Sequence, residues 1–180
     1  DGDEFDRALD EVVTERMVAH LDAMLARYAI GEPLQYVLGR WGFRRLDLAI
    51  DPRVLIPRPE TELVAGLAIE LAGQVPAPRA VADLGTGSGA IGLSVADELP
   101  LDGTTVWITD ADGDALDVAR ANVAGLGRAA TNVRVGEGEW FGALPTDQRF
   151  DVIVSNPPYV AAQSPELDDG VRAWEPARAL

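Results

Sequence analysis

The second half of the chain alternates short apolar runs with helical patterns, and this alternation limits the fold more than any other feature. The apolar runs that indicate strands are 80–84, 105–110, 132–135 and 150–155. Helical spacing is found between them, at 89–99 and 114–127. Repeated strand–helix units imply right-handed crossovers and a parallel sheet covered on both faces. We therefore predict an α/β domain, with the fourth strand beside the first if the sheet order is the usual one.

The first half has a different organisation. Apolar residues at helical spacing over 5–28 predict one or two amphipathic helices, which end at Gly31. Alternation over 41–50 predicts a strand or hairpin, and a helix is expected to begin near Glu60 and to end at Gly73. The predicted division is a helical amino-terminal segment (1–32), a hairpin and linker (33–58) and a partial catalytic domain (59–180).

Composition excludes several kinds of site. The 180 residues include no Cys and one histidine, His20, so no disulfide, thiolate metal site or other metal site is predicted. A net charge of −15 opposes stable binding to nucleic acid and favours a protein or small-molecule substrate. The densest basic cluster is interpreted as a solvated hairpin face: Arg40, Arg44, Arg45, Arg53 and Arg58. With no apolar run of membrane-spanning length and no leader, the default expectation is a cytoplasmic protein without a membrane partner.

A glycine-rich turn joins the first predicted strand to its helix. Asp83 precedes it, and the turn itself consists of Gly85, Thr86, Gly87, Ser88 and Gly89. Glycines let the backbone approach a ligand closely, and the following helix directs free N–H groups at it. The carboxyl edge of a parallel sheet is also where such folds bind ligands. We therefore predict a cofactor loop.

Two acidic residues narrow the choice of cofactor. Asp110 ends the second predicted strand, where a carboxylate accepts hydrogen bonds from ribose hydroxyls. Asp83 would repel a pyrophosphate, but it suits a ligand with positive charge, such as S-adenosylmethionine. At the end of the third strand, Glu139 is expected to accept from an adenine amino group and Trp140 to pack against the ring.

The fourth predicted strand ends in the run Asn156, Pro157, Pro158 and Tyr159. Because proline has no N–H, the Asn156 side-chain oxygen and the Pro157 carbonyl are expected to be free as acceptors. Two acceptors match the two hydrogens of a planar NH2 group, and Tyr159 offers a flat stacking surface. Such acceptors would raise electron density on an amide nitrogen and hold it for methyl transfer.

Five segments together resemble the HemK/PrmC family of protein-(glutamine-N5) methyltransferases. They are "GEPLQYVLG", "VLIPRPETELV", "DLGTGSGAIGLSVA", "VSNPPYV" and "WEPARAL", in that order. The resemblance implies a Rossmann-like class I S-adenosylmethionine-dependent methyltransferase sheet. It also implies that the acceptor is the glutamine of the GGQ motif in class I peptide chain release factors.

The resemblance also implies residue roles. The glycine loop, Asp110, Trp140 and Asn156 would bind the cofactor, and 156–159 would hold the acceptor glutamine. Arg58 and Glu60 would form the nearby wall. Two features depart from the family: Glu139 replaces its usual Asp, and few residues precede Gly31. Because such a sheet needs strands beyond "EPARAL", we infer a fragment that lacks its carboxyl-terminal strands.

Three alternatives stay open. An amino methyltransferase acting on adenine in nucleic acid would use the same NPPY chemistry. A related enzyme would methylate a glutamine of a ribosomal protein. A cofactor-binding module without catalysis belongs to a different functional class.

Overall fold

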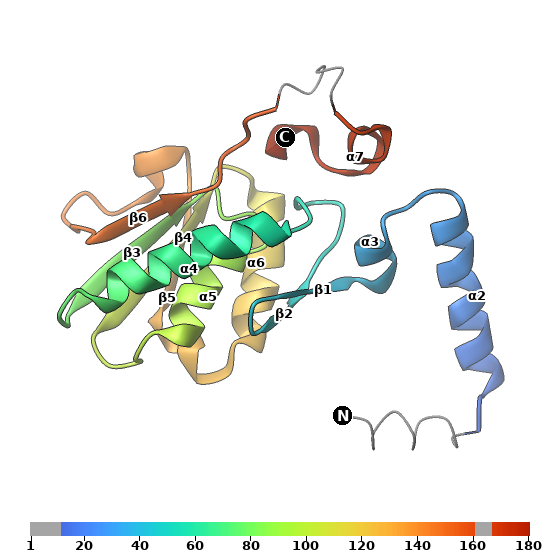
Figure 1. The fold of residues 1–180 in the computed structure, drawn as a ribbon, viewed down its shortest axis with the longest axis horizontal. Helices are drawn as coiled ribbons and strands as arrows, with labels where there is room; N and C mark the ends of the chain where they lie inside the picture. Colours follow the sequence, from blue (N-terminus) through green and yellow to red (C-terminus); the bar gives the residue numbers. More distant parts are fainter. Residues whose placement is uncertain (1–11, 161–166) are drawn as a thin grey trace.

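The computed structural model describes residues 12–160 and 167–180, and a four-stranded parallel sheet lies at its centre (Figure 1). The strands are β3 (Arg79–Leu84), β4 (Thr104–Asp110), β5 (Val133–Glu137) and β6 (Val152–Ser155). Their order is β5-β4-β3-β6, and all three pairs are parallel. The predicted α/β sheet and the position of the fourth strand beside the first are confirmed.

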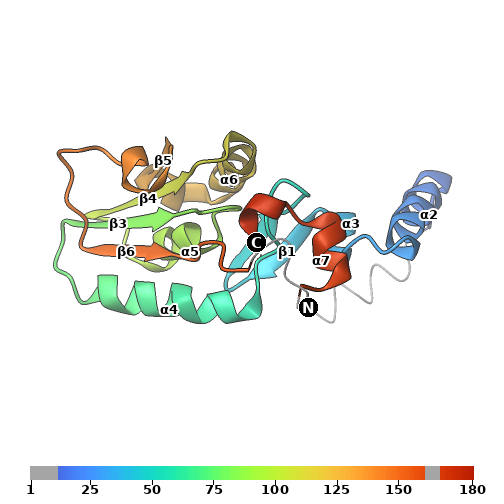
Figure 2. The same cartoon turned by 90° about the horizontal axis from the view of Figure 1, so that it is seen from above.

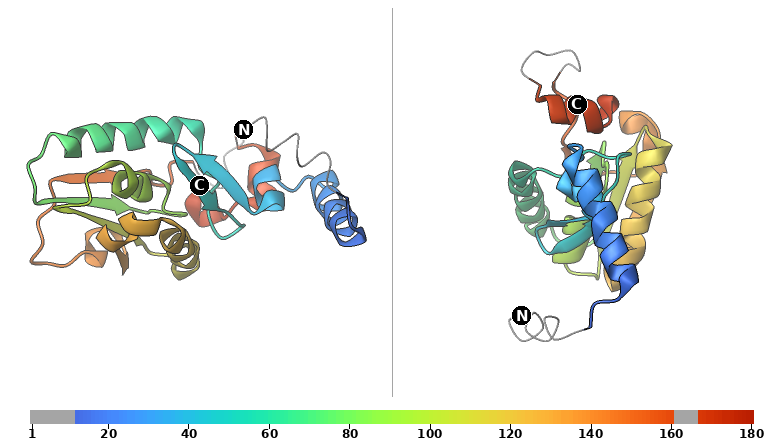
Figure 3. Two further views of the ribbon diagram at one scale, coloured as in Figure 1. Left: turned by 90° about the horizontal axis from the view of Figure 1, so that it is seen from below. Right: turned by 90° about the vertical axis from the view of Figure 1, so that its right-hand side faces the viewer.

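Three helices pack against one face of this sheet: α4 (Pro59–Gly73), α5 (Ala90–Glu98) and α6 (Gly113–Gly125). Figure 2 shows the strands in front of α5, and the view from below in Figure 3 shows α5 in front of the strands. The chain moves in one direction from β3 through β4 to β5, so right-handed crossovers place α5 and α6 on the same side. Val81, Val106 and Ile108 form the core there, each without measurable exposure.

The other face of the sheet is covered differently. Ala82 and Leu84 pack there with the partly buried Phe150 and with Leu144, which directly follows the short 3-10 helix η2 (Trp140–Ala143). Ile153, which pairs with Ala82 in the register, is 48 % exposed. Among the described residues, the predicted cover of this second face is thus present over β3, where Ala82 and Leu84 are buried, and is missing at Ile153 of the edge strand β6.

The predicted hairpin is confirmed as β1 (Arg40–Phe43) and β2 (Leu46–Ala49), preceded by α3 (Leu34–Leu38). Phe43, Leu48 and Ile50 are buried in the same core as the parallel sheet. The hairpin therefore packs as part of the main body. The division at residues 32 and 58 stays a prediction.

The amino-terminal helix α2 (Glu15–Ala29) projects away from the sheet and buries none of its residues (Figure 3). Thr14 caps it by accepting a hydrogen bond from the Met17 N–H. The prediction of helix is confirmed for 15–28, while its part before residue 12 lies outside the described residues. No helix in the described part of the chain is both long and apolar enough to cross a membrane.

All five arginines of the predicted basic cluster form ion pairs. The pairs are Arg40–Asp47, Arg44–Glu98, Arg45–Asp97, Arg53–Asp51 and Arg58–Glu175. A guanidinium already paired with a carboxylate has less to offer a phosphate backbone. Arg40, Arg44 and Arg45 lie on the hairpin as interpreted, whereas Arg53 and Arg58 come after β2, so the interpretation as one hairpin face is wrong for these two.

The end of the chain folds back over the carboxyl edge of the sheet. It forms α7 (Asp169–Trp174) and the 3-10 helix η3 (Ala177–Ala179). The Val160 N–H donates to the Leu180 carbonyl at 3.2 Å, and Leu180 is buried. This terminal segment therefore lies close to the strand end that carries the NPPY run (Figure 1).

Candidate functional site

A cavity of about 430 Å³ opens at the carboxyl ends of the strands. Its walls come from the glycine loop, the start of α6, the stretch between β2 and α4, the NPPY run and η3. The cavity lies beside β3, where the sheet order reverses between β4 and β6. Open parallel sheets bind their ligands at this kind of position.

The glycine loop adopts the backbone that its sequence predicts. Gly85, Gly87 and Gly89 have φ values of 70°, 55° and 90°, a region that residues with a side chain rarely occupy. Gly92, one turn into α5, packs so closely that an added Cβ would lie 2.4 Å from the Ile108 side chain. These constraints bring the loop and the start of α5 against the sheet, with loop residues 85–88 in the cavity wall.

Asp83 lies behind the loop and is not part of the cavity wall. Its residue is 1 % exposed, and its Oδ2 accepts from the Thr86 hydroxyl at 2.5 Å and from the Gly92 N–H at 2.9 Å. Oδ1 is buried and has no hydrogen-bond partner among the described residues. The arrangement shows Asp83 bracing the loop from inside; its direct contact with a cofactor stays a prediction.

Burial raises the pKa of Asp83 to about 6, although its hydrogen bonds with Thr86 and Gly92 oppose this shift. A folded-state pKa above the value in the unfolded chain means that the native state binds this proton more tightly. We expect the free energy of unfolding to rise by about 1 kcal/mol as the pH falls from 7.5 to 5.5. Urea melts across this range would measure the change.

The control for this prediction is Asp83→Asn, which cannot titrate. Glu32, Asp51 and Glu98 have lowered pKa values because of their arginine partners, so their contributions are lost only at a lower pH. The rise toward pH 5.5 should therefore be clearly smaller in the variant. An equal rise in both proteins would assign it to relief of the overall negative charge.

Asp110 connects the second strand to the glycine loop. Its Oδ2 accepts from the Gly87 N–H at 2.9 Å, and its Oδ1 accepts from the Asp112 N–H at 3.0 Å. Asp110 lines the cavity, and each carboxylate oxygen has a further lone pair available for a hydroxyl. The geometry is compatible with the predicted ribose contact.

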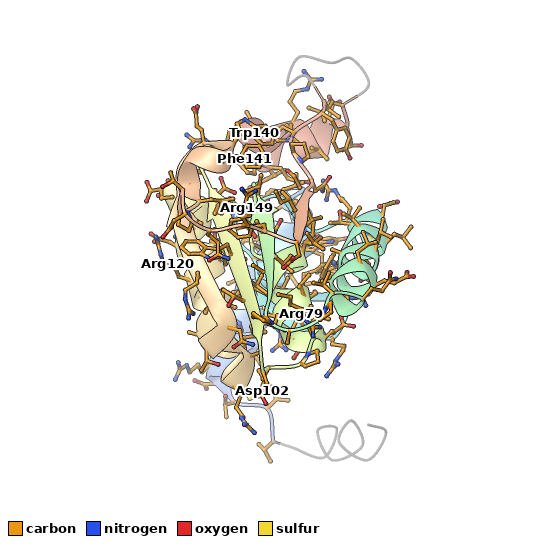
Figure 4. All side chains as sticks on the ribbon, turned by 90° about the vertical axis from the view of Figure 1, so that its left-hand side faces the viewer. Arg79, Asp102, Arg120, Trp140, Phe141 and Arg149 are labelled. Atoms are coloured by element: carbon orange, nitrogen blue, oxygen red, sulfur yellow. The ribbon has the colours of Figure 1, made fainter. Side chains whose placement is uncertain are left out.

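Glu139 and Trp140, the two predicted adenine contacts after β5, lie in different surroundings. Glu139 lines the cavity, whereas Trp140 lies outside its wall and is 58 % exposed. Trp140 also has a φ of 48°, an unusual backbone conformation for a bulky side chain. Figure 4 labels it beside Phe141, which is also exposed. Packing of Trp140 against an adenine ring stays a prediction.

The NPPY run reaches the same cavity through β6. Asn156 and Pro158 line the wall, while Pro157 does not and Tyr159 is 82 % exposed. The Ser155 hydroxyl donates to the Leu84 carbonyl at 2.7 Å, which fixes the end of β6 beside the glycine loop. Of the other predicted wall residues, Arg58 lines the cavity and Glu60 is exposed outside it.

The carboxyl-terminal wall had no predicted role. The side chain of Glu175 is 2 % exposed and accepts from the Ile56 N–H at 3.1 Å and from Arg58 Nη2 at 2.5 Å. Arg178 lines the cavity and pairs with Asp112 at 3.1 Å. The glutamate within "WEPARAL" was the only sequence feature that could have indicated this contact. Its partners lie more than a hundred residues earlier in the chain, so no local pattern connects them.

Comparisons with known proteins agree with this fold. The family model described as "Methyltransferase small domain" matches residues 67–175. A METTL16 methyltransferase domain has a TM-score of 0.51 at 21 % identity, covering 88 % of this chain and 64 % of that one. At this level of identity the likeness concerns the fold.

Curated relatives share more of the sequence. A release factor glutamine methyltransferase from Burkholderia pseudomallei is 43 % identical over 174 residues, which are 95 % of this chain and 60 % of that protein. The protein of that name from Escherichia coli is 39 % identical, over 93 % of this chain and 58 % of its own length. The chain thus spans about three fifths of these two relatives. The cavity, the sheet and the family match together show that the chain belongs to the methyltransferase small domain family and has the class I, Rossmann-like methyltransferase fold.

Proposed function

We propose that the chain is the catalytic part of a protein-(glutamine-N5) methyltransferase. Its donor would be S-adenosylmethionine, and its acceptor the GGQ glutamine of class I peptide chain release factors. One observation carries the proposal: Asn156 of the NPPY run and the glycine loop line the same cavity. The names of the curated relatives support the choice of acceptor. Because release factors act on ribosomes, the proposal includes a cytoplasmic location.

The cavity wall fits this cofactor by its chemistry. The carboxylates of Asp110 and Glu139 line the wall and are available as acceptors for hydroxyl and amino groups. When bound, S-adenosylmethionine supplies an electrophilic methyl group. Asp110 would hold the ribose, Glu139 the adenine amino group, and the loop the remaining part of the molecule.

The chain's own residues would then prepare the acceptor. The Asn156 Oδ1 and the Pro157 carbonyl would accept the two hydrogens of the glutamine amide, which raises the electron density on its nitrogen and orients it. Tyr159, which is 82 % exposed, would stack on the amide plane. The nitrogen gives up one proton to solvent as it becomes methylated.

The test offers labelled S-adenosylmethionine and the chain to four acceptors. These are a release factor with an intact GGQ motif, its Gln→Ala version, a glutamine-bearing ribosomal protein and an adenine oligonucleotide. We expect label only on the intact release factor. Label on the oligonucleotide or the ribosomal protein, or equal label on both release factors, would overturn the acceptor. Cofactor binding without transfer to any acceptor would instead support a non-catalytic module.

A further inference from the structure

Asn156 can perform its proposed role in only one of two amide orientations. With Oδ1 toward the acceptor, it accepts an N–H; rotated by half a turn, it would direct its own N–H groups at those of the substrate. The two orientations have the same shape, so packing alone discriminates weakly between them. The acceptor's N–H groups favour the first orientation, and a partner on the other side of the amide is then needed for the Asn156 Nδ2 hydrogens.

Thr61 lies where such a partner is needed. It is the third residue of α4 and the fourth of the sequence "RPETE", and it lines the same cavity as Asn156. Its hydroxyl accepts a hydrogen bond from the Asn156 Nδ2 at 3.3 Å. The bond holds Nδ2 on the α4 side, and Oδ1 is left for the acceptor.

Two features hold the Thr61 hydroxyl in place. The residue is 9 % exposed, so the atoms packed around it limit the rotation of its side chain. Its backbone N–H donates to the Arg58 carbonyl at 3.0 Å, and Arg58 is itself held by Glu175. The hydroxyl does not cap α4, because the N-cap residue is Arg58 and no side chain caps that end.

We propose that Thr61 is a positioning residue for methyl transfer: its hydroxyl receives the Asn156 Nδ2 while the amide oxygen faces the acceptor nitrogen. This inference rests on the proposed function. It also gives the RPETE and NPPY segments a joint role: the NPPY run supplies the Asn156 amide, and Thr61 of the RPETE segment holds it through Nδ2.

The test replaces Thr61 with valine, which keeps the shape of the side chain and removes the hydroxyl, and with serine, which keeps the hydroxyl. In Thr61→Val we expect kcat for the release factor to fall about tenfold to a hundredfold, with the dissociation constant for S-adenosylmethionine within about twofold. Thr61→Ser should recover most of the rate. The matched control is Thr104→Val, since Thr104 is also buried, begins β4 at the far end of the sheet and lies outside the cavity.

A second measurement does not depend on turnover. The side-chain NH2 signals of Asn156, assigned by their loss in Asn156→Asp, should shift in Thr61→Val and remain in place in Thr61→Ser and Thr104→Val. Unchanged signals, or a wild-type kcat in Thr61→Val, would overturn the inference. A wild-type chain that methylates no acceptor would overturn the proposed function, and the NH2 signals would still decide whether Thr61 holds the amide.

Discussion

Replacing Asn156 with alanine is expected to lower methyl transfer to the release factor on the order of 10²- to 10³-fold. The substitution removes the acceptor that the proposal places against the glutamine amide. The glycine loop and Asp110 remain intact, so the dissociation constant for S-adenosylmethionine should change by less than about tenfold. Initial rates at saturating cofactor and an independent binding titration would measure the two effects separately.

The control for this prediction is Asn132→Ala. Asn132 also uses its amide within the fold, donating to the Leu101 carbonyl at 2.8 Å, but it lies just before β5 at the opposite edge of the sheet. Its replacement should cost some stability and leave kcat near the wild-type value. If Asn156→Ala turned over at a near-normal rate, the amide-holding role of the NPPY run would be refuted.

The strands and most helices could be predicted because their signals are local. Short apolar runs bounded by turn residues identified β3 to β6, and Pro59 followed by acidic residues marked the start of α4. The glycine loop was predictable for a similar reason: positive φ values require glycine whatever the rest of the fold does. The glycine loop and the NPPY run each follow a strand of the same parallel sheet, so both were predicted to lie at its carboxyl edge.

The features that sequence did not reveal depend on distant partners. Which sheet face a helix covers depends on strand order, so the alternation alone could not show that α4, α5 and α6 share one face. The side chain of Asp83 lies on the face of β3 that the helices cover, and the absence of a side chain at Gly92 leaves room for its carboxylate. Neither residue by itself predicts this contact. Glu175 reaches Arg58 only because the terminal segment folds back over the cavity.

Glu175→Ala should produce the largest loss of stability among these substitutions. It would leave the buried Ile56 N–H without its acceptor and the Arg58 guanidinium without its counter-charge. Breaking a buried pair costs about 3–5 kcal/mol, and because the Arg58 side chain is 35 % exposed we expect a loss near the lower limit, about 3 kcal/mol. For a chain of this size that corresponds to a fall in Tm of about 6–12 °C, measurable by calorimetry.

A double-mutant cycle separates the pair from simple loss of packing. Arg58→Met with Glu175→Ala should be less destabilised than the sum of the two single variants, because Arg58→Met removes the charge that Glu175→Ala leaves unpaired. The matched control is Arg40→Ala, since the Arg40–Asp47 pair is exposed on both sides and should contribute at most about 1 kcal/mol. Additive losses at positions 58 and 175 would show that Glu175 stabilises the wall through its bond to Ile56 alone. A coupled loss would identify the ion pair as the link that fixes Arg58, and with it the first turn of α4, against the terminal segment.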